Sequence, residues 1–155
     1  MEPLYTTETA YTFEEFKKYN IALTIKKVLL IFLILFLYFV LFTLLWRNLA
    51  FLIIGVIFTA IFGIIFSIVM NKSIKRLYYS DKYLQKNYMC QFSFYQYYFE
   101  IKTCNSFTKF DYEDIHSIKE TKTNFYIMKS VNQGYLIVKA NCSPELIEFL
   151  SNMKN

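Results

Sequence analysis

The residues best suited to chemistry in this chain are three cysteines and a single histidine. Cys90, Cys104, Cys142 and His116 all lie in the second half of the sequence, and thiolate and imidazole groups are the ligands that zinc prefers. Structural zinc sites usually pair their ligands as C-x-x-C and H-x-x-x-H, and neither pair occurs here. We therefore expect three buried structural thiols, unpaired because the cytoplasm predicted for this segment is reducing, with no metal and no cofactor.

An acidic cluster is the other candidate for catalysis. Asp111, Glu113 and Asp114 lie close together in the sequence, and carboxyl groups can act as general acids or bases. No partner nucleophile, no metal-ligand spacing and no glycine-rich phosphate loop accompanies them. His116, between two isoleucines at the start of a predicted strand, is best interpreted as structural. The sequence therefore predicts a protein that is not an enzyme, and the acidic run is interpreted as a solvated loop.

The elements that must position these residues follow an apolar segment from Val28 to Met70, in which Arg47 is the only charge. A bilayer core about 30 Å thick is crossed by roughly 20 helical residues, and each half of this segment is long enough to cross once. Neither half has the polar face that a surface helix of a soluble protein would show. We expect a transmembrane helical hairpin over residues 28–70, with Trp46 and Arg47 at its outer turn.

Basic residues flank this hairpin on both sides, which explains the formal net charge of +5 without nucleic acid. The positive-inside rule then predicts a multi-pass protein of a bacterial plasma membrane with both termini in the cytoplasm. Basic residues directly after the second span are candidates for contact with the anionic inner leaflet. The flanking residues are Lys17, Lys18, Lys26 and Lys27 before the hairpin, and Lys72, Lys75, Arg76, Lys82 and Lys86 after it.

Small residues recur every four positions along the second span: Gly55, Thr59, Gly63 and Ser67. This spacing forms a ridge that another helix can approach closely. Two interpretations stay open: packing against the bulky first span of the same hairpin, or a homodimer interface. Because neither span contains Asp, Glu, Lys, Arg or His, a proton or ion pathway through these helices is disfavoured.

The hairpin divides the chain into four expected parts: 1–27, 28–70, 71–87 and 88–155. In the first, Leu4 to Tyr11 is interpreted as an irregular strand. An amphipathic helix then begins at Phe13, with Thr12 as its cap and Glu15 reaching back to form a capping box. Residues 71–87 are expected to form a juxtamembrane helix with basic residues and tyrosines interleaved.

Residues 88–155 change from helical to two-residue periodicity. Short segments rich in aromatic and β-branched residues follow one another, and Asn132 to Gly134 is interpreted as a hairpin turn that tolerates positive φ. Ser143 and Pro144 then start a helix whose apolar face includes Leu146, Phe149 and Leu150. The prediction is an α+β domain, a small antiparallel barrel of about six or seven strands covered by a C-terminal helix.

The segment FTKFDYEDIHSIKETKTNFYI, the following hairpin and the terminal helix resemble the YcxB-like proteins of bacteria. TFEEFKKYN before the first span also fits the usual opening of that family. The resemblance implies two membrane helices followed by a cytoplasmic domain related to the pleckstrin-homology-like (PH-like) fold. It is carried best by Phe110, Tyr112, Asp114, Ile115, Glu120, Phe125, Tyr126 and Lys139.

The function expected from this combination is a membrane-anchored binding module. Phosphoinositide-binding PH domains use basic residues around the first hairpin, whereas the segment SFYQYY has none. Recognition of a protein or peptide through Tyr95, Tyr97 and Tyr98 is therefore favoured. Two alternatives stay open: self-protection against a membrane-acting bacteriocin, which the family resemblance implies, and a small accessory subunit of a channel or transporter.

Overall fold

The computed structural model describes residues 2–81, 88–104 and 106–153 of the chain. The internal contacts divide it into two compact units. We call Met1–Tyr19 together with Tyr78–Asn155 the sheet unit, and Asn20–Leu77 the hairpin unit. This division joins the N-terminal segment to the C-terminal domain, whereas the sequence ranges kept them apart.

Two helices form the apolar part of the chain: α1 (Phe13–Trp46) and α2 (Ala50–Ser80). Both are long and apolar enough to cross a membrane, and almost none of the residues in their most apolar stretches are buried. A core helix of a soluble protein is mostly buried, so these helices lack that character.

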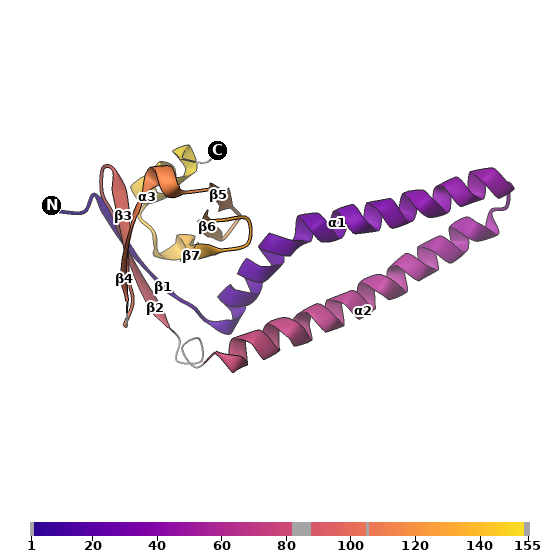
Figure 1. Ribbon diagram of the computed structural model, residues 1–155, viewed down its shortest axis with the longest axis horizontal. Helices are drawn as coiled ribbons and strands as arrows, with labels where there is room; N and C mark the ends of the chain where they lie inside the picture. The colour runs from indigo at the N-terminus through magenta and orange to yellow at the C-terminus, as the bar shows by residue number, and fades with distance from the viewer. Residues whose placement is uncertain (1, 82–87, 105, 154–155) are drawn as a thin grey trace. The chain divides into compact units, whose positions relative to one another are not determined.

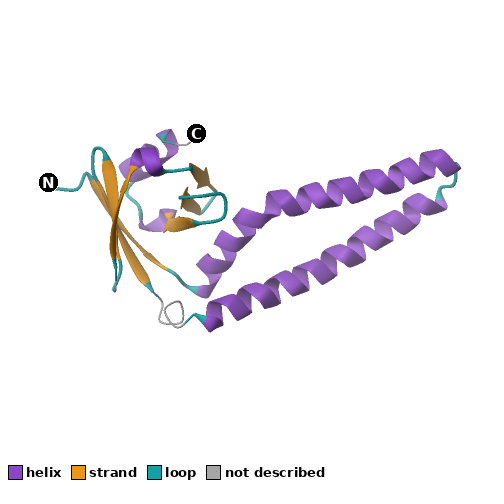
Figure 2. Ribbon diagram, viewed as in Figure 1, coloured by secondary structure: helices purple, strands orange, loops and turns teal. Residues whose placement is uncertain are grey.

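Each helix continues past the expected limits of the membrane span. Figure 2 draws both as unbroken helices. Neither the amphipathic segment before residue 28 nor residues 71–80 form a separate helix. The sequence becomes more polar before Val28 and after Met70, but a change in polarity does not end a helix. No proline or glycine interrupts either helix at these positions. Lys82, Lys86 and the rest of the juxtamembrane prediction over 82–87 lie outside the described residues.

The helix starts are capped by side chains. The hydroxyl of Thr12 accepts a bond from the backbone N–H of Glu15 at 3.4 Å, as predicted. The reciprocal half of the predicted capping box is wrong: the backbone N–H of Thr12 bonds to Ala10 O, and the Glu15 carboxylate bonds to Lys18 and Asn124. Between the helices, Arg47 has a φ of 48°, and Asn48 Oδ1 accepts a bond from the N–H of Ala50 at 2.9 Å.

The sheet unit contains two antiparallel sheets followed by a helix (Figure 1). The first sheet has the order β1 (Tyr5–Ala10), β2 (Met89–Phe94), β3 (Tyr98–Lys102) and β4 (Phe107–Asp111). The second has the order β5 (Ser117–Glu120), β6 (Asn124–Met128) and β7 (Gly134–Val138). Short 3-10 turns η2 (Tyr112–Asp114) and η3 (Lys139–Asn141) precede β5 and the final helix α3 (Pro144–Asn152).

The antiparallel sheet domain and its C-terminal helix confirm the coarse prediction, but the closed barrel is wrong. No ladder joins the two sheets among the described residues. At the edge of β7, backbone N–H groups bond to side chains from the N-terminal segment instead of to a neighbouring strand. The N–H of Val138 bonds to Thr9 Oγ1 at 3.3 Å, and the N–H of Leu136 bonds to Tyr11 Oη at 2.9 Å. Edge N–H groups are thus satisfied without strand pairing, so the sheets stay separate.

The strand β1 pairs with β2 along its whole length, from Tyr5 opposite Phe94 to Ala10 opposite Met89. Both long helices are therefore inserted between two neighbouring strands of one sheet. Thr9 of β1 is fully buried, so this N-terminal strand belongs to the packed interior of the sheet unit.

A continuous apolar core lies inside the sheet unit. Its fully buried side chains include Phe92 and Phe94 of β2, Ile137 of β7 and Leu146 of α3. Ser143 Oγ accepts a bond from the N–H of Leu146 at 3.2 Å, and Pro144 occupies the first turn, as predicted. The apolar face of α3 thus packs on the core because its start is positioned by the Ser-Pro signal.

The turn between β6 and β7 differs from the predicted one. Gly134 is the first residue of β7, and no glycine in the described chain has positive φ. A Cβ atom at this position would lie 2.6 Å from Ile127 O and 2.8 Å from Met128 Sδ. Glycine is needed here because the paired strand approaches closely, not because the turn needs a left-handed residue.

Candidate functional site

The structure does not bring the cysteines and the histidine together. Cys90 is buried in the core and Cys142 is half-buried, whereas Cys104 is exposed, so the prediction of a buried thiol is wrong for Cys104. Its position beside the β3–β4 turn explains the exposure, because strand alternation does not extend into the turn. Among the described residues, no three His, Cys, Asp or Glu side chains are grouped so that they could hold a metal ion.

The acidic cluster lies at the surface of η2 and the end of β4. Asp111, Glu113 and Asp114 are exposed, as is His116, whose backbone N–H bonds to Met128 O at 2.9 Å. A solvated acidic run is the arrangement predicted from the sequence.

The three tyrosines singled out from the sequence lie together at the β2–β3 turn. The rings of Tyr95 and Tyr98 stack with centroids 4.6 Å apart, and Tyr97 between them has 70% of its surface exposed. The neighbouring Phe94 and Phe99 face the core instead. Strand alternation therefore separates the aromatics of this hairpin into a buried set and a set that reaches the surface. We call the second set, exposed Tyr97 with half-buried Tyr95 and Tyr98, the tyrosine surface.

Two charged side chains frame the tyrosine surface. Tyr95 Oη donates to Glu100 Oε2 at 3.1 Å, and Lys109 Nζ lies 3.6 Å from the centre of the Tyr98 ring. Glu100 and Lys109 are also partners across the β3–β4 ladder. Desolvation, and after it the bond to Glu100, raises the pKa of Tyr95. The arrangement combines aromatic area with a donor, an acceptor and one cation, which suits a polypeptide better than a multiply charged phosphate.

Sequence reasoning missed Glu100 and Lys109 as members of this surface. A signal for Glu100 was present in the sequence, because strand alternation places Tyr98 and Glu100 on one face of β3. What the alternation cannot supply is the register that puts Lys109 beside them.

Tyr112 fixes the hairpin that carries the tyrosine surface. Its hydroxyl donates to Tyr95 O at 2.7 Å, and its ring lies 6.0 Å from those of Phe99 and Phe149. Burial raises the pKa of Tyr112 to about 12, so the hydroxyl keeps its proton at neutral pH. Tyr112 thus has a structural role, because it holds the hairpin in place.

A cavity of about 310 Å³ opens elsewhere in the sheet unit. Residues of both sheets line it, including Tyr11, Cys90, Thr108 and Tyr135. Its lining contains hydroxyl groups and rings but no charged side chain, so it does not offer the cationic site that a phosphorylated headgroup needs.

In the hairpin unit, the small-residue ridge meets the first helix. A Cβ atom on Gly55 would lie 2.5 Å from Phe39 Cγ, and one on Gly63 would lie 3.4 Å from Phe32 Cζ. The hydroxyls of Thr59 and Ser67 bond to Gly55 O and Gly63 O at 2.9 and 2.8 Å. Both glycines of the ridge thus face bulky side chains of α1 in the same chain.

The three basic residues assigned to the inner leaflet, Lys72, Lys75 and Arg76, lie on α2 and are exposed. Comparison of the chain with protein-family models, with curated proteins and with solved structures finds no match. Its function must therefore be argued from its own geometry.

Proposed function

We propose that this chain is a two-pass protein of a bacterial plasma membrane whose sheet unit is a non-catalytic binding module for a protein or peptide. The observation that carries the proposal is the tyrosine surface, where two stacked rings and a 70% exposed tyrosine adjoin Glu100 and Lys109. Tyrosine is enriched at binding hot spots because it offers a large rigid surface together with a hydroxyl group.

The arrangement of strands supports a PH-like module. The YcxB resemblance implies a PH-like domain, and seven described antiparallel strands followed by one helix agree with that expectation in strand number and in the terminal helix, although the strands form two sheets and not a closed barrel. In this interpretation the two membrane helices occupy the connection between the first and second strands. The segment compared with the basic first hairpin of phosphoinositide-binding domains, SFYQYY, lies at the β2–β3 turn and contains no Lys or Arg, which favours a polypeptide ligand.

The pairing of β1 with β2 supports the hairpin topology. Ala10 lies opposite Met89, so the chain must return to the side of the membrane from which it departed. The lysines and arginines near these helix ends favour the cytoplasm as that side. Reporter domains active only in the cytoplasm, fused separately to each terminus, should both be active. A reporter active at one end alone would contradict the two-pass topology.

The ligand proposal is tested by crosslinking in intact membranes. A photoreactive amino acid replaces Tyr97 in the full chain, and in a control chain it replaces Val131, which is 58% exposed on the β6–β7 turn. We expect a discrete polypeptide adduct from position 97 and none from position 131. Mass spectrometry of the adduct distinguishes a polypeptide from a lipid.

A second variant connects the adduct to the tyrosine surface. Tyr98→Ala removes the stacked ring and its contact with Lys109, and truncation of an aromatic hot spot typically weakens binding by about 5- to 30-fold. The adduct at position 97 should decrease accordingly while the protein level stays unchanged. Equal adducts from positions 97 and 131, or lipid adducts only, would overturn the proposal.

A further inference from the structure

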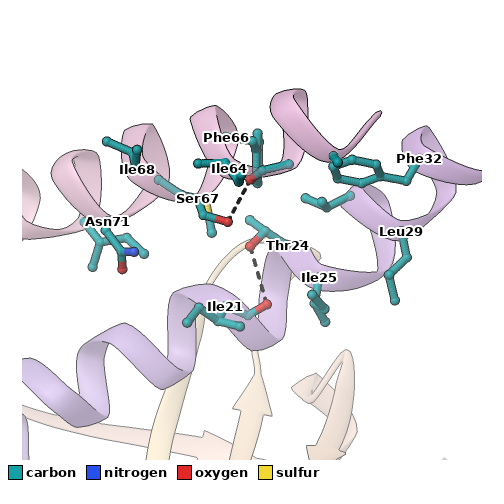
Figure 3. Close-up of a pocket in the computed structure, with 15 residues that line it drawn as sticks. Ile21, Thr24, Ile25, Leu29, Phe32, Ile64, Phe66, Ser67, Ile68 and Asn71 are labelled. Carbon is teal, nitrogen blue, oxygen red and sulfur yellow. Dashed lines mark hydrogen bonds between the residues drawn. The ribbon is translucent and has the colours of Figure 1, made fainter. Parts of the chain in front are cut away.

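An open apolar groove lies between α1 and α2 within the hairpin unit (Figure 3). Its volume is about 650 Å³, within the range of roughly 300–1,000 Å³ that small-molecule sites occupy. It is lined from one side by residues such as Ile21, Val28 and Phe32, and from the other by Gly63, Ile68 and Ile74.

An aromatic contact lies near one end of the groove, and a polar side chain lies near the other. Phe32 and Phe62 meet at 5.7 Å between ring centres, where Gly63 also faces Phe32. From Gly63 to the polar Asn71 a helix rises about 12 Å, and Ile74 lines the groove one turn further on. The hydroxyls of Thr24 and Ser67 lie between these ends and bond to carbonyls of their own helices. The middle of the groove therefore presents apolar surface.

Charge accumulates at the Asn71 end with one sign. Residues 20–77 contain no Asp or Glu, and Lys72, Lys75 and Arg76 of α2 lie near this end. Lys75 follows Asn71 by four residues, so it lies on the same side of α2 as the groove. Lys26 and Lys27 lie further along α1, between the lining residues Ile25 and Val28, and all five of these basic residues are exposed.

We propose that this groove holds one acyl chain of an anionic glycerophospholipid, with the lipid phosphate beside Lys75 and Asn71. The inference rests on the proposed membrane hairpin, which places the groove in the cytoplasmic leaflet. An apolar interior about 12 Å deep suits the part of an acyl chain nearest the headgroup, and a cationic rim suits the phosphate.

A second copy of the chain is a poorer occupant of the groove. It would bring the same basic residues to the same end, and like charges at close range repel. A lipid anion instead neutralises them.

The test uses the full chain purified in mild detergent and supplied with equimolar phosphatidylglycerol and phosphatidylethanolamine. Native mass spectrometry then counts the lipids retained by each chain. We expect one phosphatidylglycerol molecule, retained in preference to phosphatidylethanolamine. Lys75→Gln should weaken that retention about fivefold, the factor that one basic residue contributes near an anionic surface.

Filling the groove should remove the lipid altogether. Ser67→Phe places a ring in the groove from α2, and Thr24→Phe does so from α1 if the first variant does not fold. Ile65→Phe is the matched control, because Ile65 lies on the same helix, is 54% exposed and does not line the groove. Circular dichroism establishes that each variant keeps its helices.

Each other outcome overturns the proposal in a recognisable way. Equal retention of both lipids would show that the charge of the headgroup is not recognised. Unchanged retention in Ser67→Phe would show that the lipid binds outside the groove. Dimers that disappear in Ser67→Phe without any bound lipid would identify a second copy as the occupant. Failure of the membrane proposal itself looks different, since the protein would then be recovered without detergent.

Discussion

Burial determines the chemistry of the thiols at the scale of single residues. Cys90 is 2% exposed, and burial raises the pKa of its thiol from 9.0 to about 12. The neutral thiol is therefore favoured in the folded state, a contribution that is complete below about pH 9 and is lost as the pH rises towards 12. Because the thiolate is the reactive species, Cys90 should be inert near neutral pH.

Maleimide labelling of the folded full chain at pH 7.5 checks this difference. Exposed Cys104 should react at once, whereas Cys90 should react only after denaturation. The Cys104→Ser variant should lose the fast phase. Fast labelling that persists in this variant would show that a second thiol is accessible in the folded protein.

Phe149 provides a test of α3 packing. Its ring lies 5.3 Å from that of Tyr5, 6.2 Å from that of Phe94 and 6.0 Å from that of Tyr112. Phe149→Ala should therefore lower the stability of the sheet unit by about 2–4 kcal/mol. Near-ultraviolet circular dichroism of the full chain in detergent follows the transition.

The neighbouring residue is the control for Phe149. Glu148 is exposed on the same helix, so Glu148→Ala should change the transition by less than about 0.5 kcal/mol. If both substitutions lower the transition equally, the apolar face of α3 does not stabilise the sheets.

At the scale of elements, the two glycines of the α2 ridge should respond differently to the same change. Gly55→Ala would force a Cβ atom to 2.5 Å from Phe39 Cγ and 2.6 Å from its Cβ, which lie near the backbone and cannot swing away. Gly63→Ala would meet only the far edge of the Phe32 ring, at 3.4 Å.

We therefore expect Gly55→Ala to destabilise the hairpin by about 1–3 kcal/mol, the usual cost of overpacking, and Gly63→Ala to be nearly neutral. Unfolding in sodium dodecyl sulfate, followed by far-ultraviolet circular dichroism, measures the difference. A loss of self-association with an intact monomer would instead assign the ridge to a dimer interface.

Local patterns in the sequence were sufficient to predict most elements. Two-residue alternation located the strands after residue 88, and the Ser143–Pro144 signal located the start of α3. Uninterrupted apolar composition located the two helices, because no other element is apolar on all faces over such a length. The exposed tyrosines were recognised only as a cluster, since alternation alone does not say which face is buried.

The features that could not be predicted depend on contacts between distant residues. The pairing of Ala10 with Met89 joins strands separated by both helices, and no local pattern encodes a register over that distance. The separation of the two sheets depends on Thr9 and Tyr11 side chains that satisfy N–H groups of β7. The role of Gly134 depends on the close approach of β6.

At the scale of the whole molecule, the two ends of the chain, Met1–Tyr19 and Tyr78–Asn155, form one compact unit. Thr9 of β1 is fully buried and its hydroxyl accepts a bond from β7, whereas the side chain of Glu8 is exposed. Thr9→Asp would bury an unpaired carboxylate, which costs several kcal/mol. It should expose the C-terminal strands to protease although they are distant in sequence.

Limited proteolysis of the full chain in detergent, read with an antibody to a C-terminal tag, measures this effect. Glu8→Ala should leave the C-terminal fragment as resistant as in the natural protein. Equal resistance of the Thr9→Asp variant would show that β1 is dispensable for the fold.

The insertion of both helices between β1 and β2 has a consequence for biogenesis. During synthesis at about 5–20 residues per second, β1 emerges first and must wait several seconds, unpaired, until the helices have been made. In the proposed membrane topology, entry of only one helix into the bilayer would leave the two strands on opposite sides, and the sheet could not form. On that proposal, completion of the domain reports successful membrane insertion, and a wrongly inserted chain would present unpaired aromatic strands to cellular proteases.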